Sequence, residues 1–146
     1  MRQLDAIFCD DIRHEIGGKI SLIGIYGPKL FVREFPAVLP KLCVMTKSST
    51  LYTEPFKQLK IRVFKGAEVL AEADIKMDGS LPPLEPFMSE SDGPDAPIAM
   101  MGANAFFILS PFEIEGPCTL RVRADTGEGE LRGGGLRIEL APKPTA

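Results

Sequence analysis

The sequence has no tryptophan, only one histidine and three cysteines, and it has no long apolar run. No stretch of about 18 apolar residues occurs, so neither a transmembrane helix nor a membrane partner is expected. The N-terminal residues 1–5 lack the apolar region of a secretory signal, and we expect a cytoplasmic location. Cys9, Cys43 and Cys118 are odd in number and far apart, which favours reduced, buried thiols over a disulfide framework.

A surplus of basic charge is also missing. The 17 basic and 20 acidic side chains give a formal net charge of −3, and no dense basic run interrupts the chain. Nucleic-acid binding normally needs such a basic patch, so nucleic acid is not an expected partner.

The motifs of common enzymes are absent as well. The sequence has no Cys-x-x-Cys pair and no Gly-x-Ser-x-Gly elbow, and His14 lacks the second histidine of the zinc-protease motif. The segment Gly17–Lys19 lacks the remaining residues of a phosphate-binding loop. The sequence therefore favours a protein that is not an enzyme, and it indicates no cofactor.

What is present favours an all-β protein. Short segments with period-two alternation recur, whereas no window of about ten residues keeps a helical stripe. About seven to nine short strands joined by turns predict an antiparallel two-sheet β-sandwich, immunoglobulin-like or C2-like, with a small β-barrel as the alternative. We expect a single domain over residues 1–141 and a frayed tail over residues 142–146.

A long hairpin is predicted at the N-terminus. One strand approaches through Leu4–Phe8, the chain reverses at Gly17-Gly18 where positive φ costs little, and an apolar strand returns over Lys19–Tyr26. The returning strand is apolar on both faces, so one face is expected to need a cover. A homo-oligomer is one way to provide it.

Acidic residues gather in the same hairpin. Asp10, Asp11 and Glu15 are the nearest approach to a set of oxygen ligands for a hard cation such as calcium. The competing interpretation is a strand break, in which the carboxylates cap backbone N–H groups or pair with Arg13.

A second hairpin is predicted over residues 56–75. A three-residue loop, Lys65–Ala67, would place Val63 opposite Val69 and Lys60 opposite Glu72, so that apolar and polar faces agree. The Lys60 and Glu72 side chains would then form an exposed ion pair.

Residues 78–97 predict a long loop rich in proline and acid. Five prolines interrupt strand pairing there, and five acidic side chains have no basic neighbour within the segment. Loops beyond about 12–15 residues are uncommon in compact domains and tend to be functional or disordered. The apolar side chains Leu84, Phe87 and Met88 would allow this loop either to pack on the sandwich or to meet a partner.

Further strands are expected in the C-terminal half, over residues 98–101, 105–109, 118–124 and 136–140. The continuous apolar run Ala105–Leu109 suits a strand covered on both faces, or one whose second face meets another subunit. The glycine triplet Gly133–Gly135 reads as part of a turn, with the last strand beginning at Leu136.

The strings Cys9-Asp-Asp-Ile-Arg13 and Gly18-Lys-x-Ser-Leu-Ile-Gly-x-Tyr26 resemble the N-terminal signature of a family of small uncharacterised bacterial proteins of this length. The likeness spans most of the chain. It implies a bacterial, cytosolic protein of unassigned function, and it supplies no catalytic or ligand residues to transfer.

We therefore expect a non-catalytic cytosolic β-sandwich that acts through contacts with a protein partner or a second copy. The alternative is a small calcium-type metal-binding or enzyme-like domain that uses Asp10, Asp11 and Glu15. Strand edges and exposed side chains are the expected contact points. The candidate contact residues are Arg13, Lys19, Leu84, Phe87 and Met88.

Overall fold

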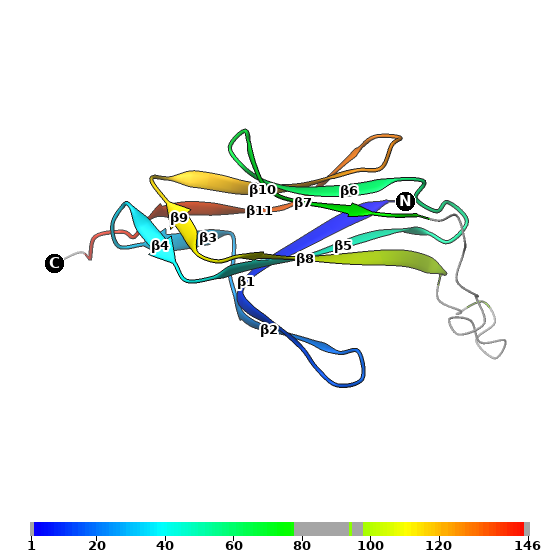
Figure 1. Cartoon of the computed structure of the whole chain (residues 1–146), viewed down its shortest axis with the longest axis horizontal. Helices are drawn as coiled ribbons and strands as arrows, with labels where there is room; N and C mark the ends of the chain where they lie inside the picture. The colour runs from blue at the N-terminus through cyan, green and yellow to red at the C-terminus, as the bar shows by residue number, and fades with distance from the viewer. Residues whose placement is uncertain (1, 78–93, 95–97, 145–146) are drawn as a thin grey trace.

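The computed structural model describes residues 2–77, 94 and 98–144, and there the chain forms strands and loops around two facing sheets (Figure 1). Sheet A has the strand order β2-β1-β5-β8, and sheet B has the order β3-β11-β10-β6-β7. Sheet A consists of β1 (Gln3–His14), β2 (Ile20–Ile25), β5 (Leu42–Leu51) and β8 (Met100–Leu109). Sheet B consists of β3 (Lys29–Val32), β6 (Leu59–Lys65), β7 (Glu68–Ile75), β10 (Cys118–Asp125) and β11 (Glu130–Leu140).

The two-sheet all-β prediction is confirmed, and neither sheet closes into a barrel within the described residues. All strand pairs in the two sheets are antiparallel except β3 with β11, which run parallel. A short third pair joins β4 (Ala37–Leu39) to β9 (Phe112–Ile114). In this described part of the chain, no helix has the length and apolar character needed to span a bilayer.

The core lies between the two sheets because alternate residues of each strand point inward. On β5, Leu42 and Val44 are fully buried, and they belong to the same hydrophobic cluster as Ile61 and Leu120 of sheet B. The hydroxyl of buried Thr46 donates a hydrogen bond to the Ala105 carbonyl at 3.2 Å, which satisfies a polar group inside this layer.

The predicted three-residue loop of the second hairpin is wrong. A two-residue turn, Gly66-Ala67, joins β6 to β7, and Gly66 adopts a φ of 61°. A bulge next to Val63 then shifts the register, so that Val63 lies opposite Ala71 and the apolar faces still agree. The predicted ion pair is confirmed at 3.2 Å between Lys60 Nζ and Glu72 Oε1, although the residue directly opposite Lys60 is Asp74.

The glycine triplet is not a turn but lies inside β11, which begins at Glu130. A Cβ atom on Gly133 would lie 3.1 Å from the Leu4 side chain, and one on Gly135 would lie 2.8 Å from the Leu120 carbonyl oxygen. The glycines therefore allow β11 to pass close to β1 of the other sheet and to its own neighbour β10.

All three cysteines are free thiols, and Cys9 and Cys43 are fully buried whereas Cys118 is partly exposed. Most of the predicted loop over residues 78–97, with Leu84, Phe87 and Met88, lies outside the described residues. The last two residues of the predicted tail do so too.

Candidate functional site

The outer half of the N-terminal hairpin, residues 10–25, projects from the sandwich, and we call it the arm (Figure 1). Strand β1 pairs with β5 from Gln3 to Cys9, and with β2 from Cys9 to His14. The arm therefore starts where β1 loses its neighbour β5 and keeps only β2.

Two buried thiols lie under the base of the arm. Cys9 and Cys43 are directly opposite each other on the outer face of sheet A, yet neither is exposed to solvent. The chain at Asp10 and Asp11 covers them, because Cys9 Sγ lies 3.4 Å from the Asp11 carbonyl and Cys43 Sγ lies 3.8 Å from the Asp10 carbonyl. Burial raises the pKa of both thiols, which keeps them protonated and makes them packing groups instead of nucleophiles.

The two aspartates brace the arm through different partners. The Tyr26 hydroxyl donates a hydrogen bond to Asp10, and burial followed by this bond raises the pKa of Tyr26 to about 12. Gly24 adopts a φ of 67°, and a Cβ there would lie 2.8 Å from Cγ of Asp10, so the carboxylate occupies the space that a side chain would take. Asp11 accepts a hydrogen bond from Lys41 at 2.8 Å, which lowers the Asp11 pKa.

The third acid of the predicted cation cluster has a partner of its own. Glu15 Oε1 lies 3.6 Å from the guanidinium of Arg13. Within the described residues, no group of three histidine, cysteine or acidic side chains is placed to hold a metal ion. The predicted strand break is wrong, because β1 runs through Asp10 and Asp11 without interruption and its register with β2 does not shift. Asp11 does cap the backbone, since its carboxylate accepts a hydrogen bond from the Ile12 N–H at 2.9 Å. The calcium-type alternative stays a prediction, and the three acids each contact a different group.

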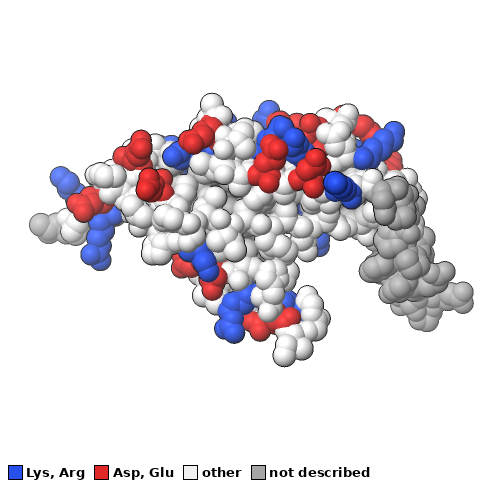
Figure 2. All heavy atoms as spheres, viewed as in Figure 1, with Lys and Arg blue, Asp and Glu red and all other residues white. Residues whose placement is uncertain are grey.

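The tip of the arm is exposed and carries one large apolar side chain among charged ones. Gly17 and Gly18 adopt φ values of 84° and 77°, which confirms the predicted reversal at these glycines. Ile16, immediately before them, is 97% exposed, and Arg13 and Lys19 are also exposed near the tip. Figure 2 shows Lys, Arg, Asp and Glu side chains gathered on the projecting arm beside uncharged atoms. Two of the predicted contact residues, Arg13 and Lys19, therefore lie on the arm.

The arm leans toward β8 across the outer face of sheet A. The His14 ring contacts the Phe106 ring edge-on, with centroids 5.1 Å apart. The strand register places Ile7, Met45 and Phe106 in one row across β1, β5 and β8, all partly buried, and Ile108 next to this row is 61% exposed. Single-sequence reasoning missed this surface because it depends on which strands are neighbours.

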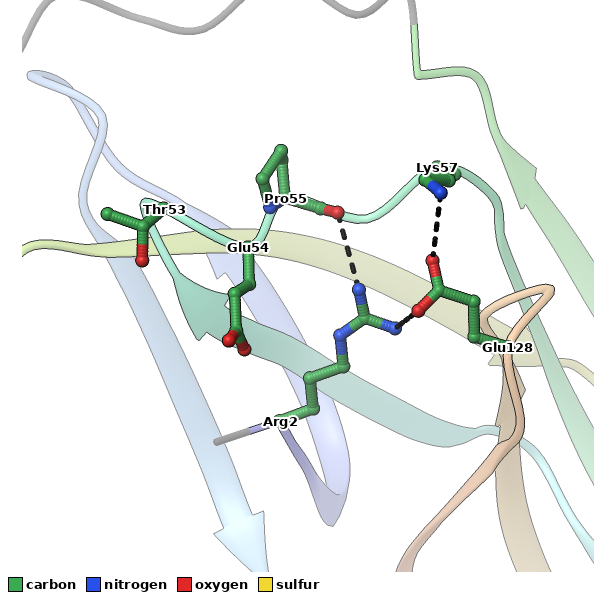
Figure 3. A pocket seen from close by; sticks show the side chains of 6 residues that line it. All are labelled: Arg2, Thr53, Glu54, Pro55, Lys57 and Glu128. Carbon is green, nitrogen blue, oxygen red and sulfur yellow. Dashed lines mark hydrogen bonds and ion pairs between the residues drawn. The ribbon is translucent and has the colours of Figure 1, made fainter.

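A pocket at the opposite end of β1 is a second candidate (Figure 3). The Arg2 guanidinium donates to the Pro55 carbonyl at 3.3 Å, lies 3.6 Å from Glu128, and stacks over the Phe56 ring at 5.1 Å. Lys57 also lies 3.6 Å from Glu128. The residues that line this pocket are Arg2, Thr53, Glu54, Pro55, Lys57 and Glu128.

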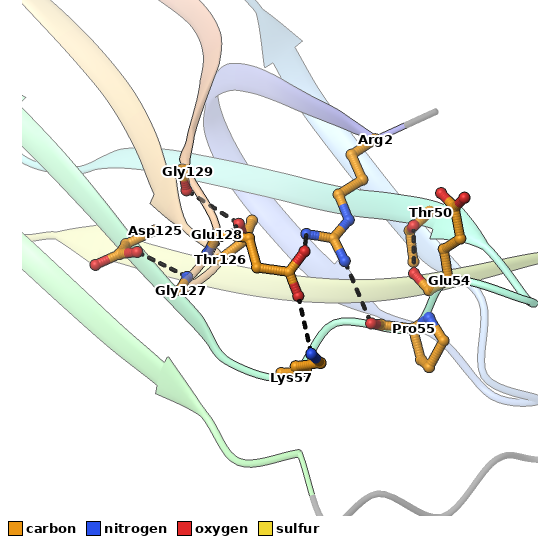
Figure 4. Close-up of polar contacts among 10 residues, drawn as sticks. All are labelled: Arg2, Thr50, Glu54, Pro55, Lys57, Asp125, Thr126, Gly127, Glu128 and Gly129. Carbon is orange, nitrogen blue, oxygen red and sulfur yellow. Dashed lines mark hydrogen bonds and ion pairs between the residues drawn. The ribbon is translucent and has the colours of Figure 1, made fainter.

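The turn between β10 and β11 holds Glu128 in place (Figure 4). The Thr126 hydroxyl donates to the Gly129 carbonyl at 3.0 Å, and the Gly127 N–H donates to the Asp125 carboxylate at 2.9 Å. Glu128 bridges Arg2 and Lys57, so this cluster fastens the N-terminal strand. The two acids that line the pocket, Glu54 and Glu128, balance its two bases, so it offers little attraction for an anion.

Comparison with known proteins gives a family but no characterised relative. The model of a family of unknown function matches residues 4–93, a range that includes the whole arm. No curated protein and no solved structure matches the chain.

Proposed function

The chain belongs to DUF6941, a family of unknown function, and we propose that it is a non-catalytic β-sandwich that works through protein contacts made by the arm. The observation that carries this proposal is a projecting hairpin with exposed isoleucine side chains that is fastened to the sandwich at its base. The bacterial cytoplasm implied by the sequence resemblance stays a prediction, as do contacts by Leu84, Phe87 and Met88.

Two exposed apolar residues of the arm are neighbours on the same face of one strand, and a third lies at the tip. Single exposed hydrophobic residues are normal on a protein surface, but contiguous ones mark interaction sites. Ile23 and Ile25 lie on one face of β2 and are 44% and 60% exposed, and Ile16 at the tip is more exposed than either. Strand β2 also forms an edge of sheet A and carries no charged side chain, so its backbone is suited to accept a partner strand.

The base contacts make the arm a preorganised binding element. A two-stranded hairpin alone is marginally stable in water. Here Asp10 is bonded to Tyr26, Asp11 to Lys41, and the His14 ring rests on sheet A. A partner then pays less conformational entropy to order the hairpin, which favours binding.

The chemistry of the tip predicts the complementary surface. Lys19 and the Arg13–Glu15 ion pair lie on either side of Ile16, so the partner is expected to offer an apolar pocket with an acidic residue for Lys19 at its rim. Such rim charges mainly set the rate and specificity of association, while the buried isoleucine side chains supply affinity.

Affinity capture from an extract of the native host tests this proposal with three baits. The first is the wild type and the second is Ile23→Gln/Ile25→Gln. The matched control is Val69→Gln/Val38→Gln, because Val69 and Val38 are 46% and 61% exposed but lie away from the arm. We expect a protein that the wild type and the control retain and the arm variant loses. Recovery of the same proteins with all three baits would contradict a role for the arm.

A further inference from the structure

Strand β8 forms the other edge of sheet A, and it lacks the protection that edge strands usually carry. Within the described residues, no strand lies beyond it. Its ten residues contain no charge and no proline. Natural edge strands are normally protected by charged side chains, proline or bulges. The edges of sheet B follow that rule, since β3 carries Lys29 and β7 carries Glu68, Glu72 and Asp74.

The outer-face residues of β8 are complementary to their own reversed order. When this set of residues is aligned with the same set in reverse order, an apolar residue at one end matches an apolar residue at the other. The glycine then matches the phenylalanine, and the central asparagine matches itself. Met100 and Ile108 at the two ends are 37% and 61% exposed. The five residues are Met100, Gly102, Asn104, Phe106 and Ile108.

We propose that β8 pairs antiparallel with β8 of a second copy of this chain, about a two-fold axis at Asn104. Met100 then lies opposite Ile108 of the copy, Gly102 lies opposite Phe106, and the two Asn104 amides face each other. An aromatic ring over a cross-strand glycine and an apolar pair are both stabilising arrangements on a sheet face.

The same axis also suits the inward face. Directly opposite residues of antiparallel strands share a face, so both sandwiches lie on one side of the joined sheet. Phe107, which is 6% exposed, would lie opposite Met101, and Ala105 would lie opposite Ala103. The two copies of sheet A would thereby form one continuous sheet, in which the order β2-β1-β5-β8 of one copy is followed by β8-β5-β1-β2 of the other.

The hydrogen bonds available match those of a standard interface. In an antiparallel ladder alternate residues direct both backbone groups to the same side, so about five residues of β8 face the open edge. Pairing two such edges forms up to about ten hydrogen bonds, the typical number for a specific interface. A strand without charge meets no like-charge repulsion from its own copy, which favours a second copy as the occupant.

Molar mass measured by light scattering or sedimentation tests the pairing. The wild type is expected at twice the chain mass of 15.9 kDa. Asn104→Lys places two positive charges against each other at the axis, near Lys47 of β5, and should weaken the dimer about tenfold or more. Mixing Asn104→Lys with Asn104→Glu should restore the dimer through opposite charges.

The control is Val69→Lys, which adds the same charge on β7 at the edge of sheet B and should leave the mass unchanged. Circular dichroism confirms that each variant is folded, and Ile108→Gln, which removes only the pair with Met100, gives a second and milder test. The pairing is overturned by a wild type that stays monomeric at every concentration, by a dimer of Asn104→Lys, or by a mixture that stays monomeric. Because the arm variant Ile23→Gln/Ile25→Gln should keep the dimer mass, this proposal and the proposed function can fail separately.

Discussion

Replacing Gly24 with alanine tests whether the base of the arm is built as described. Two costs coincide at this position. The φ of 67° costs an L residue roughly 1–2 kcal/mol. The new Cβ would lie 2.8 Å from Cγ of Asp10, so the carboxylate must move away and its hydrogen bond to Tyr26 is lost, at roughly 0.5–1.5 kcal/mol. Together these costs predict a loss of about 1.5–3.5 kcal/mol in the free energy of unfolding.

Two other glycines separate the two costs. Gly17 has a φ of 84° with nothing within 4 Å of its Cβ position, so Gly17→Ala should show the backbone cost alone. Gly27 has nothing within 4 Å and no positive φ, so Gly27→Ala should be neutral or slightly stabilising. Urea unfolding of the three variants is the assay, supported by thermal melts in which Gly24→Ala should lower Tm by roughly 5–10 °C.

The reasoning also predicts a coupling between the two residues. In an Asp10→Gly background the steric conflict disappears, so Gly24→Ala should then cost about as much as Gly17→Ala. Equal stability of Gly24→Ala and Gly27→Ala would refute the described packing. So would a Gly24→Ala penalty that is unchanged when the Asp10 carboxylate is absent.

Three further predictions concern ionisable groups at the arm. Because Lys41 lowers the pKa of Asp11, the wild type should be more stable than Lys41→Met at neutral pH. This difference in the free energy of unfolding should vanish as the pH falls through the lowered pKa of Asp11 in the folded state. A difference that persists in strong acid would contradict the pairing. Because the pKa of Tyr26 is raised to about 12, the folded state holds the phenol proton more tightly than the unfolded state does. The contribution of Tyr26 to stability should therefore be lost between about pH 10 and pH 12. Ultraviolet difference spectra of the wild type and Tyr26→Phe report the ionisation of this side chain. Cys9 and Cys43 should react with an alkylating reagent at pH 8 only as fast as the arm opens or the chain unfolds, as mass spectrometry would measure; rapid labelling of the folded protein would disprove their burial.

Local patterns predicted the strands well where one face is buried. Leu59, Ile61 and Val63 alternate with polar residues, and the structure places all three in the core. The turn after them was mispredicted because a bulge adds one residue to β7 and restores the agreement of faces. A bulge depends on the packing of both strands, so the alternation of one strand does not reveal it.

The candidate site shows the same division. The reversal at Gly17-Gly18 follows from local conformational preference, and it was predicted from the residue types alone. The hydrogen-bond partners of Asp10 and Asp11 were not predicted, because Tyr26 and Lys41 lie 16 and 30 positions along the chain from them. Such contacts depend on the order of the strands in the sheet, which local sequence patterns do not specify.

By itself, the sequence determined that this protein is all-β, with a hairpin that reverses at two glycines, because period-two alternation and turn chemistry are local properties. The tertiary structure alone decided that Cys9 and Cys43 face each other under the arm and that the uncharged strand β8 lies at a sheet edge. The physical reason is that both features arise from which strands become neighbours. Hydrophobic burial makes that choice over the whole chain at once.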